Sequence, residues 1–381
     1  WTLEWIGNWF ATFGKNNIKV MGGYSYQEFN NQGFWAENMN FPSDAPLYNN
    51  LETGSWLKLG KAGMDSWKSK EKAIAFLGRV NYSFDDTYLA SASLRYEGNS
   101  KFGKDNKWGF FPAASAAWRF SNLDALKSIS AINDLKLRAS YGVTGRSGFP
   151  RYKAQAIYKG FGRYQNDMGE WIQVYGPDNN PNFNLKWEKQ ISWNFGVDYA
   201  LFDNRLSGSL DYFIRDGRDV ISDYDAPVPP FLHQNLYTNV ATTRSNGVEL
   251  NVQWQVVKTK DFSYETNVTA SYTQSKLVKF SNGTFTKGYM DRYNLPSPGN
   301  PGPAQRLQDG VEIGSFYGTR YAGVDESGNL LIWKDAVVGG ETKLAKDKND
   351  KDKAFIGTGM PKWDLSWGHT LTYKEFDLSL F

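Results

Sequence analysis

Large apolar residues occupy nearly every second position over long stretches of this chain. The clearest run lies in the segment LKWEKQISWNFGVDYALF, which starts at Leu185. A period of two is typical of β-strands whose two faces meet different surroundings. The polar set of this run includes Asn194 and Asp198, and the apolar set consists of Trp187, Ile191, Trp193, Phe195, Val197, Tyr199 and Leu201, with Lys189 as the one break.

The same alternation predicts twelve strands, whereas amphipathic helical patterns are almost absent. The one short helix we expect is LDALKSI, within residues 121–134. The pattern therefore predicts an all-β, antiparallel fold. The predicted strands are residues 1–12, 17–28, 73–84, 87–97, 109–120, 135–143, 187–202, 205–216, 246–257, 262–278, 362–374 and 376–381.

Short and long connections between these strands alternate. An up-and-down meander of this kind places every tight turn at one end and every long loop at the other. Outer-membrane barrels are sorted in this way, and a globular sandwich has no reason to be. The short connections are 13–16, 85–86, 121–134, 203–204, 258–261 and 375, and the long ones are 29–72, 98–108, 144–186, 217–245 and 279–361.

A barrel wall also explains how long alternation coexists with a negative mean hydropathy. In a bilayer every backbone polar group needs a partner within the protein, so only helices and closed barrels span it. One face of each barrel strand meets hydrocarbon and the other meets a polar lumen. We therefore expect Trp193, Phe195 and Val197 to face lipid, and Asn194 and Asp198 to face inward.

Aromatic residues gather beside the predicted tight turns. Amphipathic rings favour the headgroup level, so this clustering indicates the periplasmic girdle of a barrel. The alternative is aromatic pairing across the strands of a soluble β-core. The clustered residues are Tyr82, Phe84, Tyr88, Trp118, Phe120, Tyr199, Phe262, Tyr264, Tyr373 and Phe376.

Composition narrows the possible classes further. The 381 residues are 16% aromatic and carry a formal net charge of only +3, with no basic block that would indicate nucleic-acid binding. The absence of cysteine excludes disulfides and thiolate metal sites. No run approaches the length of a membrane helix, and no signal peptide is recognisable. Both ends are strand-like, so we expect the sequence to be cut from a longer protein.

Several long motifs follow one another over nearly the whole chain. They are LGRVNYSFDDTYLASASLRYEGNSKFGKDNKWGFFPAASAAWRFS (77–121), LKLRASYGVTG (135–145), NPNFNLKWEKQISWNFGVDYALFDNRLSGSLDYFIRD (180–216), YDAPVPP (224–230), NVATTRSNGVEL (239–250), IGSFYGTRYAGVDESGN (313–329) and IGTGMPKWDLSWGHTLTYKEFDLSLF (356–381). In sequence and in order, these motifs resemble the SusC/RagA family of TonB-dependent outer-membrane transporters of the Bacteroidetes.

This resemblance implies that residues 1–381 are about half of a transmembrane barrel of roughly 22 strands. The leader, the N-terminal domain, the TonB box, the plug, the first strands and the last strands are expected to lie outside the sequence. An open half-barrel in lipid would leave unpaired strand edges at a cost of several kcal/mol per group. The rest of the wall must therefore come from elsewhere.

The resemblance also implies a function and a set of partners. It implies TonB-dependent import of a glycan oligosaccharide or a peptide across the outer membrane, without enzymatic activity and without a cofactor. The implied partners are a SusD-like surface lipoprotein that caps the extracellular mouth, the TonB–ExbB–ExbD complex acting through the plug, and the outer-membrane lipid or lipopolysaccharide around the barrel.

Two groups of side chains are candidates for functional contacts. Aromatic residues in the long loops suit the flat faces of sugars or peptide side chains, although they can equally pack the loops together; they are Phe161, Tyr164, Trp171, Tyr175, Phe231 and Tyr237. Charged residues of inward parity are expected to meet the plug or lumen water; they are Arg79, Arg95, Glu97, Glu188, Asp198, Asp211 and Glu249.

Metal and catalytic signals are weak. The segment AKDKNDKDKAF offers Asp347, Asn349, Asp350 and Asp352 as calcium ligands, but it lacks the glycine and the distal bidentate carboxylate of a calcium loop. A solvated loop is the simpler interpretation. His233 and His369 have no partners at metal-ligand spacing. GKDNK at 103–107 lacks the remainder of a phosphate-binding loop, and no catalytic set can be assembled.

Three alternatives stay open at this point. One is a passive pore or adhesin on the same barrel, and another is a barrel subunit of a larger outer-membrane complex. The last is a soluble carbohydrate-binding β-protein, which the sorting of the loops disfavours.

Overall fold

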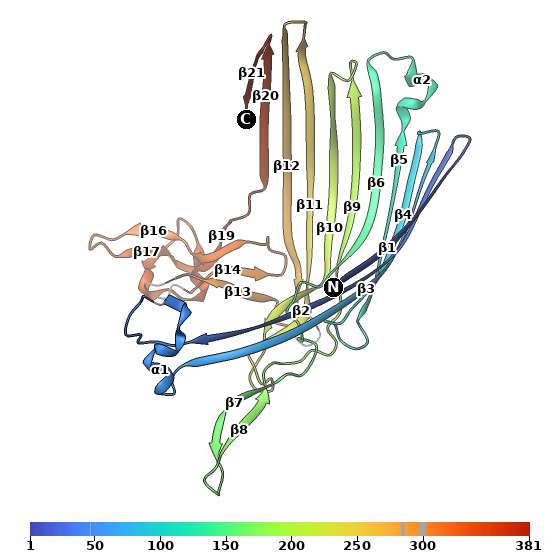
Figure 1. The fold of residues 1–381 in the computed structure, drawn as a ribbon. Helices are drawn as coiled ribbons and strands as arrows, with labels where there is room; N and C mark the ends of the chain where they lie inside the picture. Colours follow the sequence, from blue (N-terminus) through green and yellow to red (C-terminus); the bar gives the residue numbers. More distant parts are fainter. Residues whose placement is uncertain (46, 283–285, 297–301) are drawn as a thin grey trace.

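The computed structural model of the protein describes residues 1–45, 47–282, 286–296 and 302–381 (Figure 1). Its main element is a 12-stranded antiparallel sheet in which each strand pairs with its neighbour along the set. All twelve predicted strands are confirmed. Their bounds are β1 Thr2–Phe13, β2 Asn16–Glu37, β3 Gly63–Phe84, β4 Tyr88–Asn99, β5 Trp108–Arg119, β6 Ile132–Arg146, β9 Glu188–Leu201, β10 Leu206–Asp225, β11 Asn235–Lys258, β12 Phe262–Phe280, β20 Trp363–Tyr373 and β21 Phe376–Leu380.

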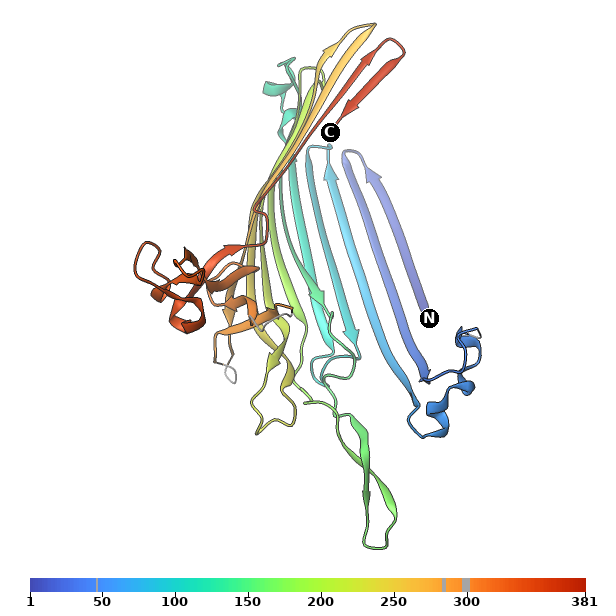
Figure 2. The same cartoon turned by 90° about the vertical axis from the view of Figure 1, so that its left-hand side faces the viewer.

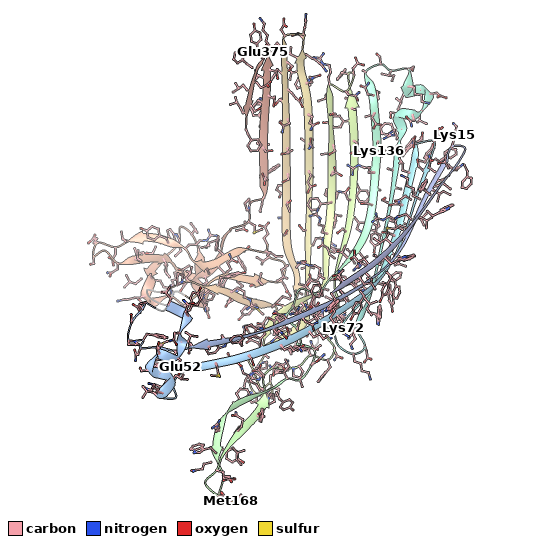
Figure 3. The ribbon with its side chains drawn as sticks, in the orientation of Figure 1. Lys15, Glu52, Lys72, Lys136, Met168 and Glu375 are labelled. Atoms are coloured by element: carbon pink, nitrogen blue, oxygen red, sulfur yellow. The ribbon has the colours of Figure 1, made fainter. Side chains whose placement is uncertain are left out.

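The sheet is a strongly curved, open wall with β1 and β21 at its two edges (Figure 2). The tight turns lie together at the end that is uppermost in Figure 1, and the long connections lie together at the other end. Figure 3 places Lys15 and Glu375 at the tight-turn end and Met168 beyond the opposite end. The predicted sorting of the connections is therefore confirmed.

Several connections are shorter than predicted because the strands continue past the alternating segments. β2 and β3 stay paired without a register shift as far as Glu37 and Gly63, so the loop between them is 38–62 and the predicted bounds of 29–72 were wrong. Backbone pairing does not require alternation where both faces of a strand meet the same surroundings.

The register gives the sheet two chemically different faces. Directly paired residues lie on the same face, so the row Leu137–Val197–Leu210 across β6, β9 and β10 continues through Leu250 to Leu365 of β20. From the tight turns to a band of aromatic residues nearer the loops, none of the described residues on this face is Asp, Glu, Lys or Arg. We call this side of the sheet the outward face, and we call its uncharged stretch the apolar band. The opposite side is the polar face.

The predicted short helix is present as α2 (Asp124–Lys127) at the tight-turn end. No helix among the described residues is both long enough and apolar enough to cross a membrane.

Four small structural units extend from the loop end of the sheet. The loop-end units are the hairpin β7 (Tyr158–Gln165) with β8 (Trp171–Pro177), the sheet β13 (Tyr289–Asn294), β14 (Pro303–Gln308), β15 (Ser315–Thr319) and β19 (Lys353–Thr358), the sheet β16 (Tyr321–Val324), β17 (Leu330–Trp333) and β18 (Thr342–Leu344), and α1 (Ser55–Lys58) with its neighbouring turns.

A hydrophobic cluster joins the loops to the polar face at the loop end of the sheet. Its centre is Trp187, whose ring centroid lies 4.4 Å from that of Phe102 and 5.2 Å from that of Phe111. The Phe111 ring fits against Gly109 and Gly145, where an added Cβ would lie only 2.3 Å and 2.2 Å from it. The cluster consists of Phe102, Phe111, Phe149, Ala154, Leu185 and Trp187.

The position of Trp187 corrects the sequence interpretation. Its parity grouped it with the lipid-facing residues, but β9 begins only at Glu188 and the Trp187 side chain is 4% exposed. Its indole N–H donates to the Lys107 carbonyl oxygen at 2.9 Å. Parity fixes a face only within a paired strand, and Trp187 precedes the strand.

Candidate functional site

The seven charged residues predicted to point inward all lie on the polar face. Arg79, Arg95 and Glu97 share this face through the pairing of β3 with β4, and Asp198, Asp211 and Glu249 share it through β9, β10 and β11. Glu188 belongs to the same set because it pairs with Arg146 on β6. Contact of these residues with a plug or with lumen water stays a prediction.

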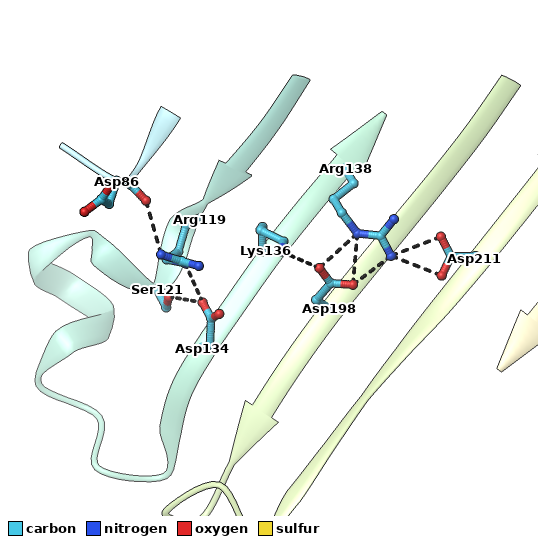
Figure 4. Close-up of polar contacts among 8 residues, drawn as sticks. All are labelled: Asp86, Arg119, Ser121, Asp134, Lys136, Arg138, Asp198 and Asp211. Carbon is cyan, nitrogen blue, oxygen red and sulfur yellow. Dashed lines mark hydrogen bonds and ion pairs between the residues drawn. The ribbon is translucent and has the colours of Figure 1, made fainter. Parts of the chain in front are cut away.

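An ion-pair network crosses three strands at the centre of the polar face (Figure 4). Arg138 on β6 reaches Asp198 on β9 at 2.7 Å and Asp211 on β10 at 3.0 Å. Lys136 adds a third contact, with its Nζ 2.6 Å from Asp198. These side chains are 14–31% exposed, so the network is partly shielded by the wall.

Gly196 makes the longer of these bridges possible. It lies on β9 directly between Arg138 and Asp211 in the register. A Cβ at this position would lie 2.4 Å from a carboxylate oxygen of Asp211 and 2.7 Å from a guanidinium nitrogen of Arg138. Neither Arg138 nor Gly196 could be recognised from the sequence, because only the cross-strand register shows that they meet.

A second polar group fixes the longest connection at the tight-turn end (Figure 4). Asp134 forms an ion pair with Arg119 at 3.1 Å and accepts a hydrogen bond from the Ser121 hydroxyl at 3.0 Å. Arg119 also donates to the Asp86 carbonyl oxygen at 3.5 Å. This group holds the α2 connection against the neighbouring turn.

Removing the Arg138 cation is expected to weaken the wall. In Arg138→Gln, two partly buried carboxylates lose their main partner, and we expect the free energy of unfolding to fall by about 1–3 kcal/mol. Denaturant unfolding of the full-length protein in lipid vesicles would measure this loss. Arg79→Gln is the matched control, because the described residues show no ion pair to Arg79; equal losses in both variants would contradict the network's role.

Beside this network the polar face is rich in carboxylates and hydroxyls. Asp211, Glu249, Ser271 and Asp364 form one row across β10, β11, β12 and β20. They line a shallow depression of about 440 Å³ together with Ser209, Asn251, Thr269 and other residues of these strands. Such a surface can accept hydrogen bonds from hydroxyl groups or cationic side chains.

The structure separates the six aromatic residues predicted for substrate contact into three places. Phe161, Tyr164, Trp171 and Tyr175 lie on the β7–β8 hairpin, where they are 53–70% exposed. Phe231 is partly buried and packs against a cluster around Leu277 and Phe280. For all six aromatic residues, substrate contact stays a prediction.

Tyr237 lies elsewhere, at a small polar pocket between two loops. The Lys153 ammonium lies 5.2 Å from the centre of its ring. The pocket has a volume of about 330 Å³ and is also lined by Asp178, Asn179, Asn180, His233, Gln234 and Asn235. Its size suits one sugar ring or one amino-acid side chain.

Asparagine side chains hold this pocket together. Asn180 donates to the Asn235 carbonyl oxygen at 3.0 Å and accepts from the backbone N–H of Leu232 at 3.1 Å. Asn182 donates to the Tyr237 carbonyl oxygen at 2.9 Å. The loop after β6 is thereby tied to the loop after β10.

Neither histidine has the surroundings of a metal ligand. His233 Nε2 lies 3.1 Å from the Pro177 carbonyl oxygen, and His369 Nδ1 lies 2.9 Å from the Tyr264 hydroxyl. Within the described residues no group of three or more His, Cys, Asp or Glu side chains is arranged to hold a metal ion.

The candidate calcium segment is held by internal contacts instead. Asp352 is fully buried; its carboxylate lies 2.6 Å from Lys343 Nζ and accepts hydrogen bonds from the backbone N–H groups of Asp335 and Asn349. The Asn349 side chain caps the turn of Asp350–Asp352. Burial alone would raise the pKa of Asp352, but Lys343 and the two N–H groups lower it to about 2.

Because the pKa of Asp352 is lowered, we expect the loop that contains it to lose stability in acid. A carboxyl with a lowered folded-state pKa stabilises the fold above its unfolded value near 4, and this contribution disappears as the pH falls toward 2. We expect Asp352→Asn to lower the hydrogen-exchange protection factors of β16–β18 at neutral pH. These protection factors, which correct for the pH dependence of the intrinsic exchange rate, should not fall further between pH 5 and pH 2. Asp350→Asn, at a 91%-exposed side chain, is the control; equal exchange in the two variants would contradict this role.

The comparisons with known proteins fit this wall. The profile of the family described as "TonB dependent receptor-like, beta-barrel" matches residues 1–378. The chain belongs to this family. It is 31% identical over 384 residues to TonB-dependent receptor P3 of Formosa agariphila, covering 97% of this chain and 37% of that protein. It is 26% identical over 389 residues to TonB-dependent receptor SusC of Bacteroides thetaiotaomicron, covering 97% and 36%.

Solved structures show the same fold. The RagAB peptide importer in its closed-closed state superposes with a TM-score of 0.83 at 23% identity, covering 99% of this chain and 40% of that chain. The open-open state gives 0.80 at 24% identity, with 39% of that chain covered. The resemblance to SusC/RagA transporters and the outer-membrane location are therefore confirmed, and the chain spans well under half of each of these relatives.

Proposed function

We propose that the protein of which this chain is a part imports a nutrient across the outer membrane in a TonB-dependent manner. The observation that carries the proposal is the contrast between the two faces of the sheet. The outward face has no charged residue in its apolar band, whereas the polar face carries the ion-pair network and the row of carboxylates that begins at Asp211. A wall of this kind separates lipid from a wet interior. Further wall strands would pair with the edges β1 and β21, and a plug would fill the interior.

The proposed cargo is a glycan oligosaccharide or a peptide, gathered by the loops together with a SusD-like lipoprotein. The exposed aromatic hairpin and the polar pocket at Tyr237 support a role of the loops in ligand or partner contact. RagAB is named as a peptide importer, and this supports a peptide as one of the two cargo classes.

Uptake by the native host tests the proposal. Cells lacking the gene would be complemented with the full-length protein, with or without its TonB box, and supplied with labelled oligosaccharides or labelled peptides. We expect uptake of one cargo class only with the intact TonB box. Uptake that survives loss of the TonB box would indicate a passive pore, and unchanged uptake in the deletion strain would indicate an adhesin or a structural subunit.

Affinity purification of the full-length protein tests the partner. A SusD-like lipoprotein in stoichiometric amount is the expected result. Stoichiometric partners of another kind would instead favour a barrel subunit of a larger complex.

A further inference from the structure

Among the residues that the structure describes, charged side chains on the outward face of the sheet lie only at its loop end, and most of them are basic. On each of four consecutive strands, β9 to β12, a charged residue lies four positions beyond an outward-facing residue of the apolar band. The pairs, with the apolar residue first, are Trp193 and Lys189, Tyr212 and Asp216, Val248 and Arg244, and Tyr272 and Lys276.

These residues are neighbours across the sheet. Asp216 pairs with Arg244, and Arg244 pairs with Lys276, while Arg218 pairs with Lys189. Asp216 is 16% exposed and forms a two-bond ion pair with Arg244, at 2.6 and 2.8 Å. Arg218, about half exposed, lies 3.4 Å from the same carboxylate. We call Lys189, Arg218, Arg244 and Lys276 the basic belt.

Acidic neighbours do not neutralise the belt. Glu312 and Asp219 are two further carboxylates in this region, and each is already bonded to a lysine outside the belt at 2.9 Å, Glu312 to Lys362 and Asp219 to Lys186. Six cations, the belt and these two lysines, therefore face three carboxylates, and the side chains of Arg218 and Arg244 are 50% and 53% exposed. Net positive charge stays available to a ligand that arrives from the outward side.

The same arrangement recurs on β3. Lys68, Lys70 and Lys72 share the outward face with Phe76, because β2 and β3 pair without a register shift. Lys70 and Lys72 lie 2.6 and 3.6 Å from the carboxylate oxygens of Glu28, and both ammonium groups remain about half exposed. Figure 3 shows Lys72 near the loop end of its strand.

The position of these cations in the membrane decides their partner. Phe76 and Phe84 are eight residues apart on one strand, which is about 27 Å along the strand and about 21 Å along the membrane normal at the tilt of a barrel strand. This distance is close to the height of the apolar band of outer-membrane barrels. Residues four positions beyond the band lie about 10 Å further out, at the level of lipid headgroups.

We propose that the basic belt binds the phosphate groups of the glycolipid of the outer leaflet, a lipid A. The acyl chains of that lipid would pack on the apolar band, where the rings of Tyr141 and Trp193 lie 4.6 Å apart. The phosphates would replace water around Arg218 and Lys276, which are not bound in the two-bond pair. This inference rests on the membrane location of the wall and is independent of the cargo.

Native mass spectrometry of the delipidated full-length protein tests the proposal. The probes are phosphorylated lipid A, the same lipid A after enzymatic dephosphorylation, and inorganic phosphate. We expect the phosphorylated lipid to bind at least roughly tenfold more tightly than the dephosphorylated one, because each cation near a charged membrane surface contributes a several-fold gain. Equal binding of the two lipids, or equal competition by inorganic phosphate, would overturn the lipid site.

A pair of variants locates the site. Arg218→Gln combined with Lys276→Gln removes two cations and keeps the Arg244–Asp216 pair, and we expect roughly tenfold weaker binding of phosphorylated lipid A. Arg79→Gln combined with Arg215→Gln removes two cations from the polar face and should bind as the wild type does. Unchanged binding in the first double variant would refute the assignment. If that variant does not fold, the comparison of the two lipids on the wild type decides.

Discussion

Val80→Arg is expected to destabilise the inserted barrel by about 2–4 kcal/mol, the cost of a cation on the lipid face near the middle of the bilayer. Val80 lies midway between Phe76 and Phe84 on β3 and faces outward with both of them. Its side chain is 44% exposed in the isolated wall, which is consistent with contact with acyl chains. Equilibrium unfolding of the full-length protein from lipid vesicles would measure the loss.

The matched control is the next residue along the strand. Asn81 lies on the polar face, opposite Ser91 and Lys19, so Asn81→Arg places the same cation in a wet interior. We expect a loss of less than about 1 kcal/mol there, as for most solvated surface substitutions. If the two substitutions cost the same, the two faces do not meet different solvents.

Trp187→Ala is expected to produce the second large effect. Emptying a buried tryptophan site usually costs about 3–5 kcal/mol, and here the Lys107 carbonyl oxygen also loses its indole donor. The cluster around Phe102 and Phe111 would loosen, so the loss should appear as faster hydrogen exchange in the loops 100–107 and 147–187.

Trp193→Ala serves as the comparison for Trp187→Ala. Trp193 is 45% exposed on the outward face, where lipid can fill the space of a missing ring. We expect little change in the exchange of the loops in this variant. Loosening of the loops in Trp193→Ala, or its absence in Trp187→Ala, would show that Trp187 does not anchor them.

The alternating segments made the wall predictable from sequence alone. In β9 and β10 every second side chain meets apolar surroundings, so every second residue has to be apolar. This alternation makes the two strands recognisable in the sequence. The contrast between Val197 and Asp198 follows from this constraint and from nothing else in the chain. The sorting of short turns and long loops was also predictable, because the lengths of the connections follow directly once the strands have been placed in the sequence.

Features outside the membrane band were not predictable in the same way. The continuation of β2 to Glu37 passes through NNQGFWAE, whose polar residues occupy both faces. The β7–β8 hairpin is stabilised by local backbone pairing, and the small sheet that contains β15 and β19 by pairing between segments far apart in the chain; neither leaves a parity in the sequence. Trp187 was misassigned because its spacing fits the strand that begins one residue later.

The candidate site required the cross-strand register. Asp198 and Asp211 were recognised as inward-facing, but their shared partner Arg138 lies 60 residues before Asp198 in the chain. Gly196 has a role only because two long side chains pass over it. Pair contacts of this kind depend on which strands are neighbours and how they are shifted, and alternation in one strand contains no such information.

Spin labels at Phe195 and Asn194 of the full-length protein in bilayers test the central claim, that the outward face contacts lipid and the polar face does not. This part of the chain has no cysteine, so single labels can be introduced here through Phe195→Cys or Asn194→Cys. We predict that the label at 195 collides readily with oxygen and rarely with a water-soluble nickel chelate, and that the label at 194 does not show this preference. High nickel accessibility at 195, or the same profile at both positions, would contradict the account.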